Sequence, residues 1–183
     1  MPGDDAPGDD ASGAGSSGDL APAAADWTAV VVAGEDDWDA VVDLRMRVFV
    51  DEQGVPEELE LDEHDDDPVA SDVDHLLVRD AAGDAVAVAR LRAVDGADYG
   101  SDADRVAKVE RVVVARDRRG EGWGGRVMAA AETRARERGL GEAVLHAQTR
   151  AAGFYERLGY AVDDAVGVFE EDGIDHVRMR KAL

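Results

Sequence analysis

The hydrophobic pattern of this chain predicts an α+β domain built around a central sheet. Apolar and polar residues alternate along 75–79 and 86–94, which is the period of β-strands. In residues 38–53 the apolar side chains recur at helical spacing instead. A β-branched apolar run at 109–115 then leads through a glycine-rich stretch into a second helical pattern that ends near residue 138. A length of 183 residues suits one domain and a tail.

The first half of the domain is expected to contain a strand, a helix and a hairpin. Residues 27–33 form the first strand, and residues 38–53 form an amphipathic helix with Val41, Leu44 and Val48 on its apolar face. Residues 55–74 are polar and acidic, and we expect a solvated loop there. The strands at 75–79 and 86–94 flank a turn at 81–84 and form the hairpin.

The second half is expected to alternate strands and helices and to finish in another hairpin. The 109–115 strand and its helix are followed by a strand at 143–147 and a short helix over 150–158. Alternation resumes at 165–169 and at 176–179, on either side of a turn at 171–173.

The N-terminal segment differs in composition from the rest of the chain. Residues 1–26 consist mainly of Gly, Ala, Asp, Ser and Pro, so they bury too little apolar surface to offset the entropy of ordering. We expect a disordered acidic tail over 1–26 and the folded domain over 27–183. The tail lacks the basic start and apolar run of a signal peptide, and no stretch approaches the ~20 apolar residues of a membrane helix. We therefore expect a cytoplasmic protein that does not bind membranes.

Charge and cysteine usage narrow the possible partners. The chain has no cysteine, which excludes disulfides, thiolate metal sites and a cysteine nucleophile. Its formal net charge is −22. One interpretation is an acidic binding surface. The interpretation we favour is a haloadapted, haloarchaeal-type composition, in which dense carboxylates keep the surface hydrated in high salt. Nucleic-acid binding is not expected, because phosphate contacts need exposed basic patches.

The stretch 119–124, Arg-Gly-Glu-Gly-Trp-Gly, has the features of an anion site. It lies between a strand and a helix, so the free N–H groups of the first helical turn point at any ligand bound there. Gly122 and Gly124 let the backbone approach that ligand closely. Arg116, Arg118 and Arg119 add positive charge in an otherwise acidic chain. These features predict a pyrophosphate cradle.

Four interpretations of this loop compete. A Walker A loop is excluded because no Gly-Lys-Ser/Thr follows the glycines. Gly120, Gly122 and Gly125 fit the dinucleotide pattern G-x-G-x-x-G, but four residues separate the strand from the first glycine, and only one more strand–helix unit follows. Arg119, Gly122 and Gly124 also fit Arg-x-x-Gly-x-Gly, a pattern used to hold coenzyme A. The fourth interpretation is an ordinary glycine-rich turn.

Several further motifs occur in a fixed order along the chain. They are 47–53 (Arg-Val-Phe-Val-Asp-Glu-Gln), 75–77 (His-Leu-Leu), 89–91 (Ala-Arg-Leu), 109–114 (Val-Glu-Arg-Val-Val-Val), the 119–124 pattern, 147–148 (Ala-Gln), 154–160 (Phe-Tyr-Glu-Arg-Leu-Gly-Tyr) and 171–176 (Glu-Asp-Gly-Ile-Asp-His). Together the motifs resemble the GNAT superfamily of acetyl-CoA-dependent N-acetyltransferases, and its ElaA-like branch in particular, over roughly residues 38–181.

The resemblance implies a fold, a co-substrate and a set of binding residues. It implies a mostly antiparallel central sheet, flanked by helices and splayed between its fourth and fifth strands, here 109–115 and 143–147. It implies that acetyl-CoA is the co-substrate. The implied cofactor contacts are Val112, Val113 and Val114 on the fourth strand, Arg119, Gly120, Gly122, Trp123 and Gly124 in the cradle, and Gln148 and Tyr155 beyond the fifth strand. Gln148 stands where many members of the superfamily have Asn.

The implied reaction needs a proton acceptor for the ammonium group, a donor to the developing oxyanion and an acid for the leaving thiolate. Tyr155 matches the general acid of the superfamily, although a packed aromatic residue with its hydroxyl bonded to backbone is the alternative. Glu110 and Glu52 are the candidate bases. A lone histidine on a buried strand, such as His146, is more often a core residue. His64 lies among acidic residues, but a solvated loop explains it better, and no metal is expected.

The acceptor is expected to be a primary amine of a small molecule or peptide, and the protein is expected to be a monomer or homodimer. Two other functions stay open at this point. One is a non-catalytic module that senses acetyl-CoA, and the other is an NAD(P)-binding oxidoreductase.

Overall fold

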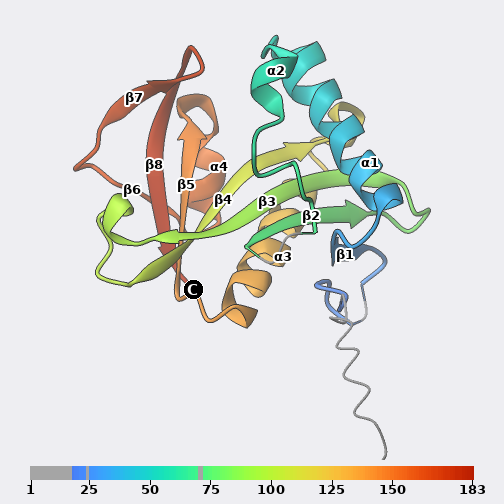
Figure 1. Cartoon of the computed structure of the whole chain (residues 1–183), viewed down its shortest axis with the longest axis horizontal. Coiled ribbons are helices and arrows are strands. Elements are labelled where there is room, and N and C mark those ends of the chain that lie inside the picture. The colour runs from blue at the N-terminus through green and yellow to red at the C-terminus, as the bar shows by residue number, and fades with distance from the viewer. Residues whose placement is uncertain (1–17, 24, 70–71) are drawn as a thin grey trace, which may run out of the picture.

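The computed structural model describes residues 18–23, 25–69 and 72–183. Eight strands form one twisted sheet, in the order β1-β2-β3-β4-β5-β8-β6, with β7 paired to β8 (Figure 1). The strands are β1 (Thr28–Val31), β2 (Val73–Arg79), β3 (Ala85–Asp95), β4 (Arg105–Val114), β5 (Glu142–Gln148), β6 (Ala161–Val162), β7 (Val168–Glu171) and β8 (Ile174–Ala182). The α-helices are α1 (Glu35–Arg45), α2 (Glu57–Glu60), α3 (Trp123–Glu137) and α4 (Ala152–Arg157).

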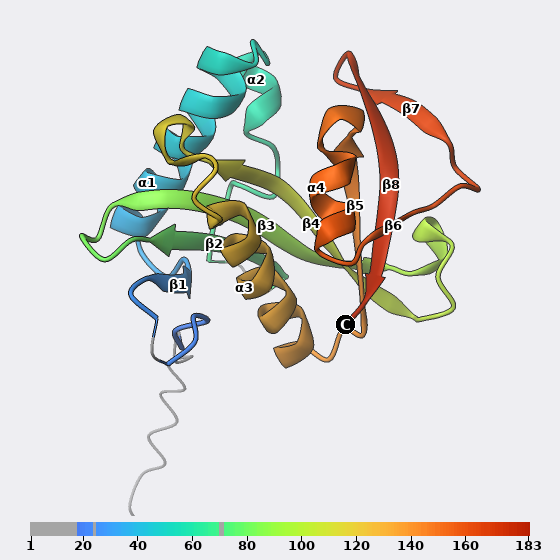
Figure 2. The ribbon, with the colours of Figure 1, turned by 180° about the vertical axis from the view of Figure 1, so that it is seen from behind.

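Helices cover both faces of the sheet. Helix α1 crosses one face over β2, β3 and β4, and α3 and α4 lie on the opposite face (Figures 1 and 2). Val41 and Leu44 of α1, and Val48 just beyond it, are buried against the sheet, as the helical pattern predicts. Val127 and Met128 of α3 are buried in a larger cluster on the other face. The predicted α+β class is confirmed, with its core in two layers on either side of the sheet.

The predicted splay of the sheet is also confirmed. Strands β4 and β5 are the parallel pair, and they pair only at Ala107–Ala143 and Lys108–Val144. All other neighbouring strands are antiparallel. Beyond Lys108 the two strands diverge, which leaves the rest of β4 without a partner on that side. A wedge-shaped gap therefore opens in the middle of the sheet.

The predicted helix over 38–53 differs in its second half. It is α-helical only as far as Arg45 and continues as a π-helical segment, Met46–Glu52. The wider turn is closed by a bond from the amide of Gln53 to the carbonyl of Val48, at 3.2 Å. Segments of this kind are rare and are frequently found at functional sites. Here the segment faces the gap between β4 and β5.

The N-terminal segment packs against the domain where the structure describes it. Leu20 is 9% exposed and belongs to the same buried cluster as Trp123. Its amide donates to the carbonyl of Ala29 at 2.7 Å, and Asp19 Oδ1 accepts from the amide of Ala29 at 3.1 Å. Leu20 therefore supplies an apolar anchor within the segment that was expected to be a tail. Residues 1–17 and 24 of the predicted tail lie outside the described residues.

Candidate active site

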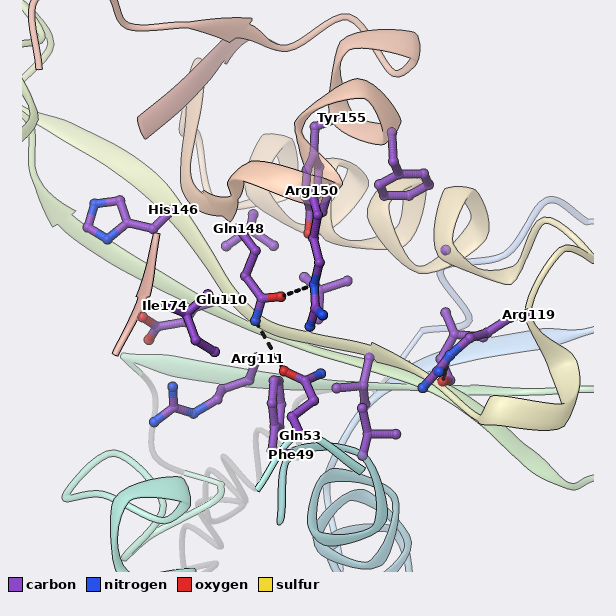
Figure 3. A pocket seen from close by; sticks show the side chains of 18 of the residues that line it. Phe49, Gln53, Glu110, Arg111, Arg119, His146, Gln148, Arg150, Tyr155 and Ile174 are labelled. Atoms are coloured by element: carbon purple, nitrogen blue, oxygen red, sulfur yellow. Dashed lines mark hydrogen bonds between the residues drawn. The ribbon is translucent and has the colours of Figure 1, made fainter. Parts of the chain in front are cut away.

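A cleft of about 870 Å³ occupies the splay between β4 and β5. All the site residues expected from the sequence line it: Glu52, Glu110, Val112, Val113, Val114, Arg119, Gly120, Gly122, Trp123, Gly124, Gln148 and Tyr155. Figure 3 shows Arg119 at one end, Glu110, Ile174 and His146 at the other, and Tyr155 and Gln148 between them. We call these the cradle end and the acceptor end.

The glycine loop at the cradle end presents free amides to the cleft. Gly120 and Gly122 have φ of +84° and +86°, a conformation that a side chain disfavours. No acceptor for the N–H groups of residues 120–125 is found within the described parts of the chain. Gly122 caps α3, whose 15 residues add the positive end of the helix dipole. The loop therefore offers the hydrogen-bond donors and the positive potential that a pyrophosphate group would need.

Arginines surround this loop and are held in place by their neighbours. The Arg118 guanidinium donates to Glu121 Oε2 at 3.0 Å and to Asp80 Oδ2 at 2.6 Å. Arg126 lies 4.3 Å from the centre of the Trp123 ring and donates to the carbonyl of Glu121 at 2.9 Å. These contacts fix positive charge beside the free amides.

Gly124 has a different reason for being glycine from the one expected. A Cβ at this position would meet the Phe154 ring at 2.9 Å, which is closer than side chains pack. The missing side chain of Gly124 therefore lets α3 pack closely against α4. This packing role is additional to the close approach to a ligand that was expected. The positive φ at Gly120 and Gly122 is what shapes the loop itself.

A β-bulge interrupts β4 in the middle of the cleft. The pairing with β3 advances from Arg90–Glu110 to Val88–Val113, so one extra residue sits on β4. Arg111 takes up that residue with φ of +52°. The bulge turns the backbone of Val112 to Val114 toward the gap, where it lines the cleft. These are the residues expected to hold the thioester oxygen and the pantetheine arm.

Tyr155 lies in the wall of the cleft on α4. The residue is 9% exposed, and burial raises the pKa of its phenol to about 12. The hydroxyl therefore keeps its proton near neutral pH and can donate it. Its ring packs edge-on against Phe154 and Tyr160. The alternative for Tyr155 is a packed aromatic residue whose hydroxyl bonds to the backbone. Among the described residues, no such bond of the Tyr155 hydroxyl is found.

Glu110 is held by three cations. Its carboxylate lies 3.0 Å from Arg90 Nε, 2.5 Å from Arg92 Nε and 3.1 Å from Lys108 Nζ. Burial alone would raise the pKa of Glu110, but the bond to Arg92 and the charges of Arg90 and Lys108 outweigh it and lower the pKa to about 2. Such a carboxylate is a weak base, so the geometry favours a structural role for Glu110.

Glu52 and Gln148 connect the two walls of the cleft. Glu52, at the end of the π-helical segment, lies 2.9 Å from Arg119, so it faces the cradle end and not the acceptor end. Gln148 donates to Gln53 Oε1 at 3.1 Å and accepts from Arg150 Nε at 2.9 Å (Figure 3). Sequence reasoning missed Gln53 as a partner, because 95 residues separate it from Gln148.

A buried ionic cluster supports the acceptor end. Arg45 lies 2.6 Å from Glu60 and 2.8 Å from Asp65. Arg90 lies 2.7 Å from Asp62 and 3.2 Å from Asp65. Both arginines are at most 2% exposed. The expectation of a solvated loop over 55–74 is therefore wrong for these acids, because buried arginines neutralise them. No group of three or more His, Asp or Glu side chains that could hold a metal ion is found in the described residues.

His146 is likewise placed differently from the expectation of a satisfied core residue. Its side chain is 23% exposed, lines the cleft and bonds to Glu171 of β7. The β7–β8 hairpin brings Glu171, Ile174 and His176 to the same end. The motif at 171–176 signals this hairpin, but the period of β5 gave no sign that its histidine faces a cleft.

Comparison with known proteins identifies the family. Residues 45–183 match the model of the acetyltransferase (GNAT) domain. The chain is 35% identical over 153 residues to the uncharacterized N-acetyltransferase YjcF of Bacillus subtilis, covering 84% of this chain and 98% of that protein. The chain belongs to the GNAT acetyltransferase family.

Solved structures show the same fold. An acyl-CoA N-acyltransferase from Pseudomonas aeruginosa superposes with a TM-score of 0.69 at 30% identity, covering 86% of this chain and 99% of that one. Escherichia coli ElaA superposes with a TM-score of 0.68 at 28% identity, covering 85% of this chain and 97% of that one.

Among the helices that the structure describes, none has the length and apolarity to cross a bilayer.

Proposed function

We propose that this protein transfers the acetyl group of acetyl-CoA directly to a primary amine of a small molecule or peptide. The observation that carries the proposal is one continuous cleft with three features in order. A cradle of free amides is followed by the bulged strand and then by a buried tyrosine that keeps its proton. Acetyl-CoA supplies the activated acyl group when bound.

Each part of the cleft then has a chemical task. The amides of 120–125 and the neighbouring arginines hold the pyrophosphate. The backbone of Val112 to Val114 positions the pantetheine arm and polarises the thioester oxygen. Tyr155 donates its proton to the leaving sulfur. The acceptor amine enters between the π-helical segment and the β7–β8 hairpin, at the acceptor end.

Further assignments rest on the same proposal. Similarity to E. coli ElaA supports membership of the ElaA-like branch. The net charge of −22 supports a chain adapted to high salt. Because acetyl-CoA is an intracellular metabolite, the proposed reaction implies a cytoplasmic protein. Monomer and homodimer both keep the cleft within one chain.

Release of free thiol from acetyl-CoA, measured against a panel of amines and short peptides, tests this function. We expect amine-dependent thiol release and formation of an N-acetylated product. Retention on a CoA resin without turnover of any amine would favour a non-catalytic sensor. Retention on a nicotinamide resin and not on a CoA resin would favour an oxidoreductase.

Tyr155→Phe tests the acid. The change removes one hydroxyl and little packing, so kcat should fall about 10²–10⁴-fold with CoA affinity kept. Tyr160→Phe is the matched control, because Tyr160 is also buried, packs edge-on against Tyr155 and is not among the residues that line the cleft. The control should keep the wild-type kcat. Equal rates for wild type and Tyr155→Phe would leave Tyr155 as a packing residue.

A further inference from the structure

A histidine and a glutamate form a pair at the acceptor end. His146 Nδ1 and Glu171 Oε2 are 3.0 Å apart. The carboxylate can only accept a hydrogen bond, so the proton of this bond belongs to His146 Nδ1. In a neutral imidazole the lone pair then lies on Nε2. The bond to His146 is also the main cause that lowers the pKa of Glu171, which keeps this carboxylate ionised.

The free nitrogen of His146 is available to a substrate. Nε2 has no hydrogen-bond partner among the described residues. It is also not one of the unpartnered polar atoms that are buried, so it has an exposed surface. Solvent therefore reaches Nε2. Phe169 packs edge-on against the ring at 4.8 Å, and Tyr99 lies 6.1 Å away, so the ring is held by aromatic contacts as well as by Glu171.

His146 lies on β5 at the point where β4 and β5 separate, and its side chain faces the cleft. Gln148, two residues further, reaches across the cleft to Gln53, and residues two apart on a strand share a face. The last pair between the strands is Lys108–Val144, so Glu110 and His146 occupy equivalent positions on the two walls where the gap opens. Figure 3 shows both at the acceptor end.

The other candidates for a base at this cleft are occupied. Glu110 is bound by three cations, and Glu52 is paired with Arg119 at the cradle end. His176 has Nδ1 2.8 Å from the carbonyl of Ile174 and stacks on Phe169, but no carboxylate bonds to its ring in the described structure.

We propose that His146 takes the proton from the acceptor ammonium and that Glu171 is a positioning residue that holds the ring with Nε2 free. The inference rests on the proposed acetyl transfer and names its base. His146 Nε2 takes one proton, and the neutral nitrogen forms the N–C bond as the C–S bond breaks. The nitrogen loses its second proton to solvent, and His146 Nε2 also returns its proton to solvent. Tyr155 gives a proton to the sulfur and regains one from solvent, so one proton is released per turnover.

His146→Gln tests the base, with His64→Gln as the control, because His64 does not line the cleft. With the amine that releases thiol fastest, His146→Gln should lower kcat/KM at pH 7 about 10²–10⁴-fold, and CoA affinity should stay unchanged. The deficit should shrink as pH rises toward the pKa of the amine, because the amine then loses its proton unaided. His64→Gln should keep the activity. The reverse ranking of the two variants would overturn the proposal.

The pH profile must be interpreted with all the groups around the ring. The charged and titratable side chains that face His146 are Glu171 on β7, Lys108 and Glu110 on β4, Arg178 and His176 on β8, and Tyr99 before β4. A deficit in His146→Gln that is independent of pH would show that the side chain acts by packing, which would overturn the assignment of a base.

A second measurement needs no substrate. Nitrogen-15 shifts of the His146 ring should report the Nδ1–H tautomer at neutral pH, and Glu171→Gln should lose this preference. An Nε2–H tautomer in the wild-type protein would overturn the proposal even if acetyl transfer is confirmed. A protein with the Nδ1–H tautomer and no turnover of any amine would instead overturn the proposed function, and the base assignment with it.

Discussion

The two ends of the cleft are built in opposite ways. The cradle end comes mainly from one short stretch, residues 119–125, in which the backbone amides of residues 120–125 have no acceptor in the described chain. The acceptor end is assembled from α1, the π-helical segment, α2, β3, β4, β5 and the β7–β8 hairpin. There the charged groups satisfy one another through ion pairs of 2.5–3.2 Å.

The difference teaches where each end obtains its stability. The amides of residues 120–125 lack acceptors within the described chain, so an anion bound there as proposed would supply the missing hydrogen bonds. The ionic cluster at the acceptor end is neutralised without ligand, because Arg45 and Arg90 pair with the acids buried beside them. Substitutions at the cradle should therefore act mainly on binding, and substitutions in the ionic cluster should act mainly on folding.

The largest effect is expected at Arg90. Arg90→Met keeps much of the volume but leaves Asp62, Asp65 and Glu110 short of a cation, and breaking a buried ion pair in this way costs about 3–5 kcal/mol. Urea unfolding measures this loss. Arg47→Met is the control, because Arg47 pairs with Asp43 on the surface and such pairs contribute about 0–1 kcal/mol. Equal losses in the two variants would contradict the division between the ends.

The pH dependence of stability should come next. Since the pKa of Glu110 is about 2 when folded and 4.5 ordinarily, its stabilisation is fully present above pH 4.5 and is lost as pH falls toward 2. This difference corresponds to about 3 kcal/mol. Unfolding free energies between pH 2 and 6 should therefore fall less steeply for Glu110→Gln than for wild type. The exposed Asp117→Asn is the control, and a wild-type slope for Glu110→Gln would contradict the ion pairing.

A smaller effect is expected from the glycines of the cradle. Gly122→Ala forces a side chain into positive φ, which costs about 1–2 kcal/mol. Gly139→Ala is a matched control, because Gly139 has φ of +73°, open space around it and no place in the cleft. Both variants should lose similar stability, but only Gly122→Ala should weaken CoA binding, by about tenfold or ~1.4 kcal/mol. Calorimetric titration with CoA measures the affinity of each variant. Equal affinities for Gly122→Ala and Gly139→Ala would show that the loop is not part of the CoA site.

The smallest effect is expected from the N-terminus. Deleting residues 1–17 removes almost no large apolar side chain and should leave the melting temperature unchanged. Deleting residues 1–26 also removes Leu20, which packs in the cluster of Trp123 beside the cradle, and should cost about 1–2 kcal/mol. Equal melting temperatures for the two truncations would show that Leu20 does not support the cradle end.

Local sequence determined the cradle and most of the secondary structure. The positive-φ glycines, the arginines and the start of α3 are close in the chain, so their order alone predicts an anion site. The strands from β1 to β5, β7 and β8 were predicted within a few residues. Alternating patterns indicated β2, β3, β7 and β8, and an apolar β-branched run indicated β4. Strand β6, of two residues, and the four-residue helix α2 are too short for a periodic signal, and both were missed.

Only the tertiary structure decided the acceptor end. Glu110 and Arg90 are 20 residues apart, and His146 and Glu171 are 25 apart, so no local pattern relates them. In the sequence Asp62 and Asp65 look like members of a solvated acidic run, and His146 looks like a core residue. Their roles depend on which opposite charge the folded chain places within about 3 Å, because the strength of an ionic contact depends on distance and burial and not on separation along the chain.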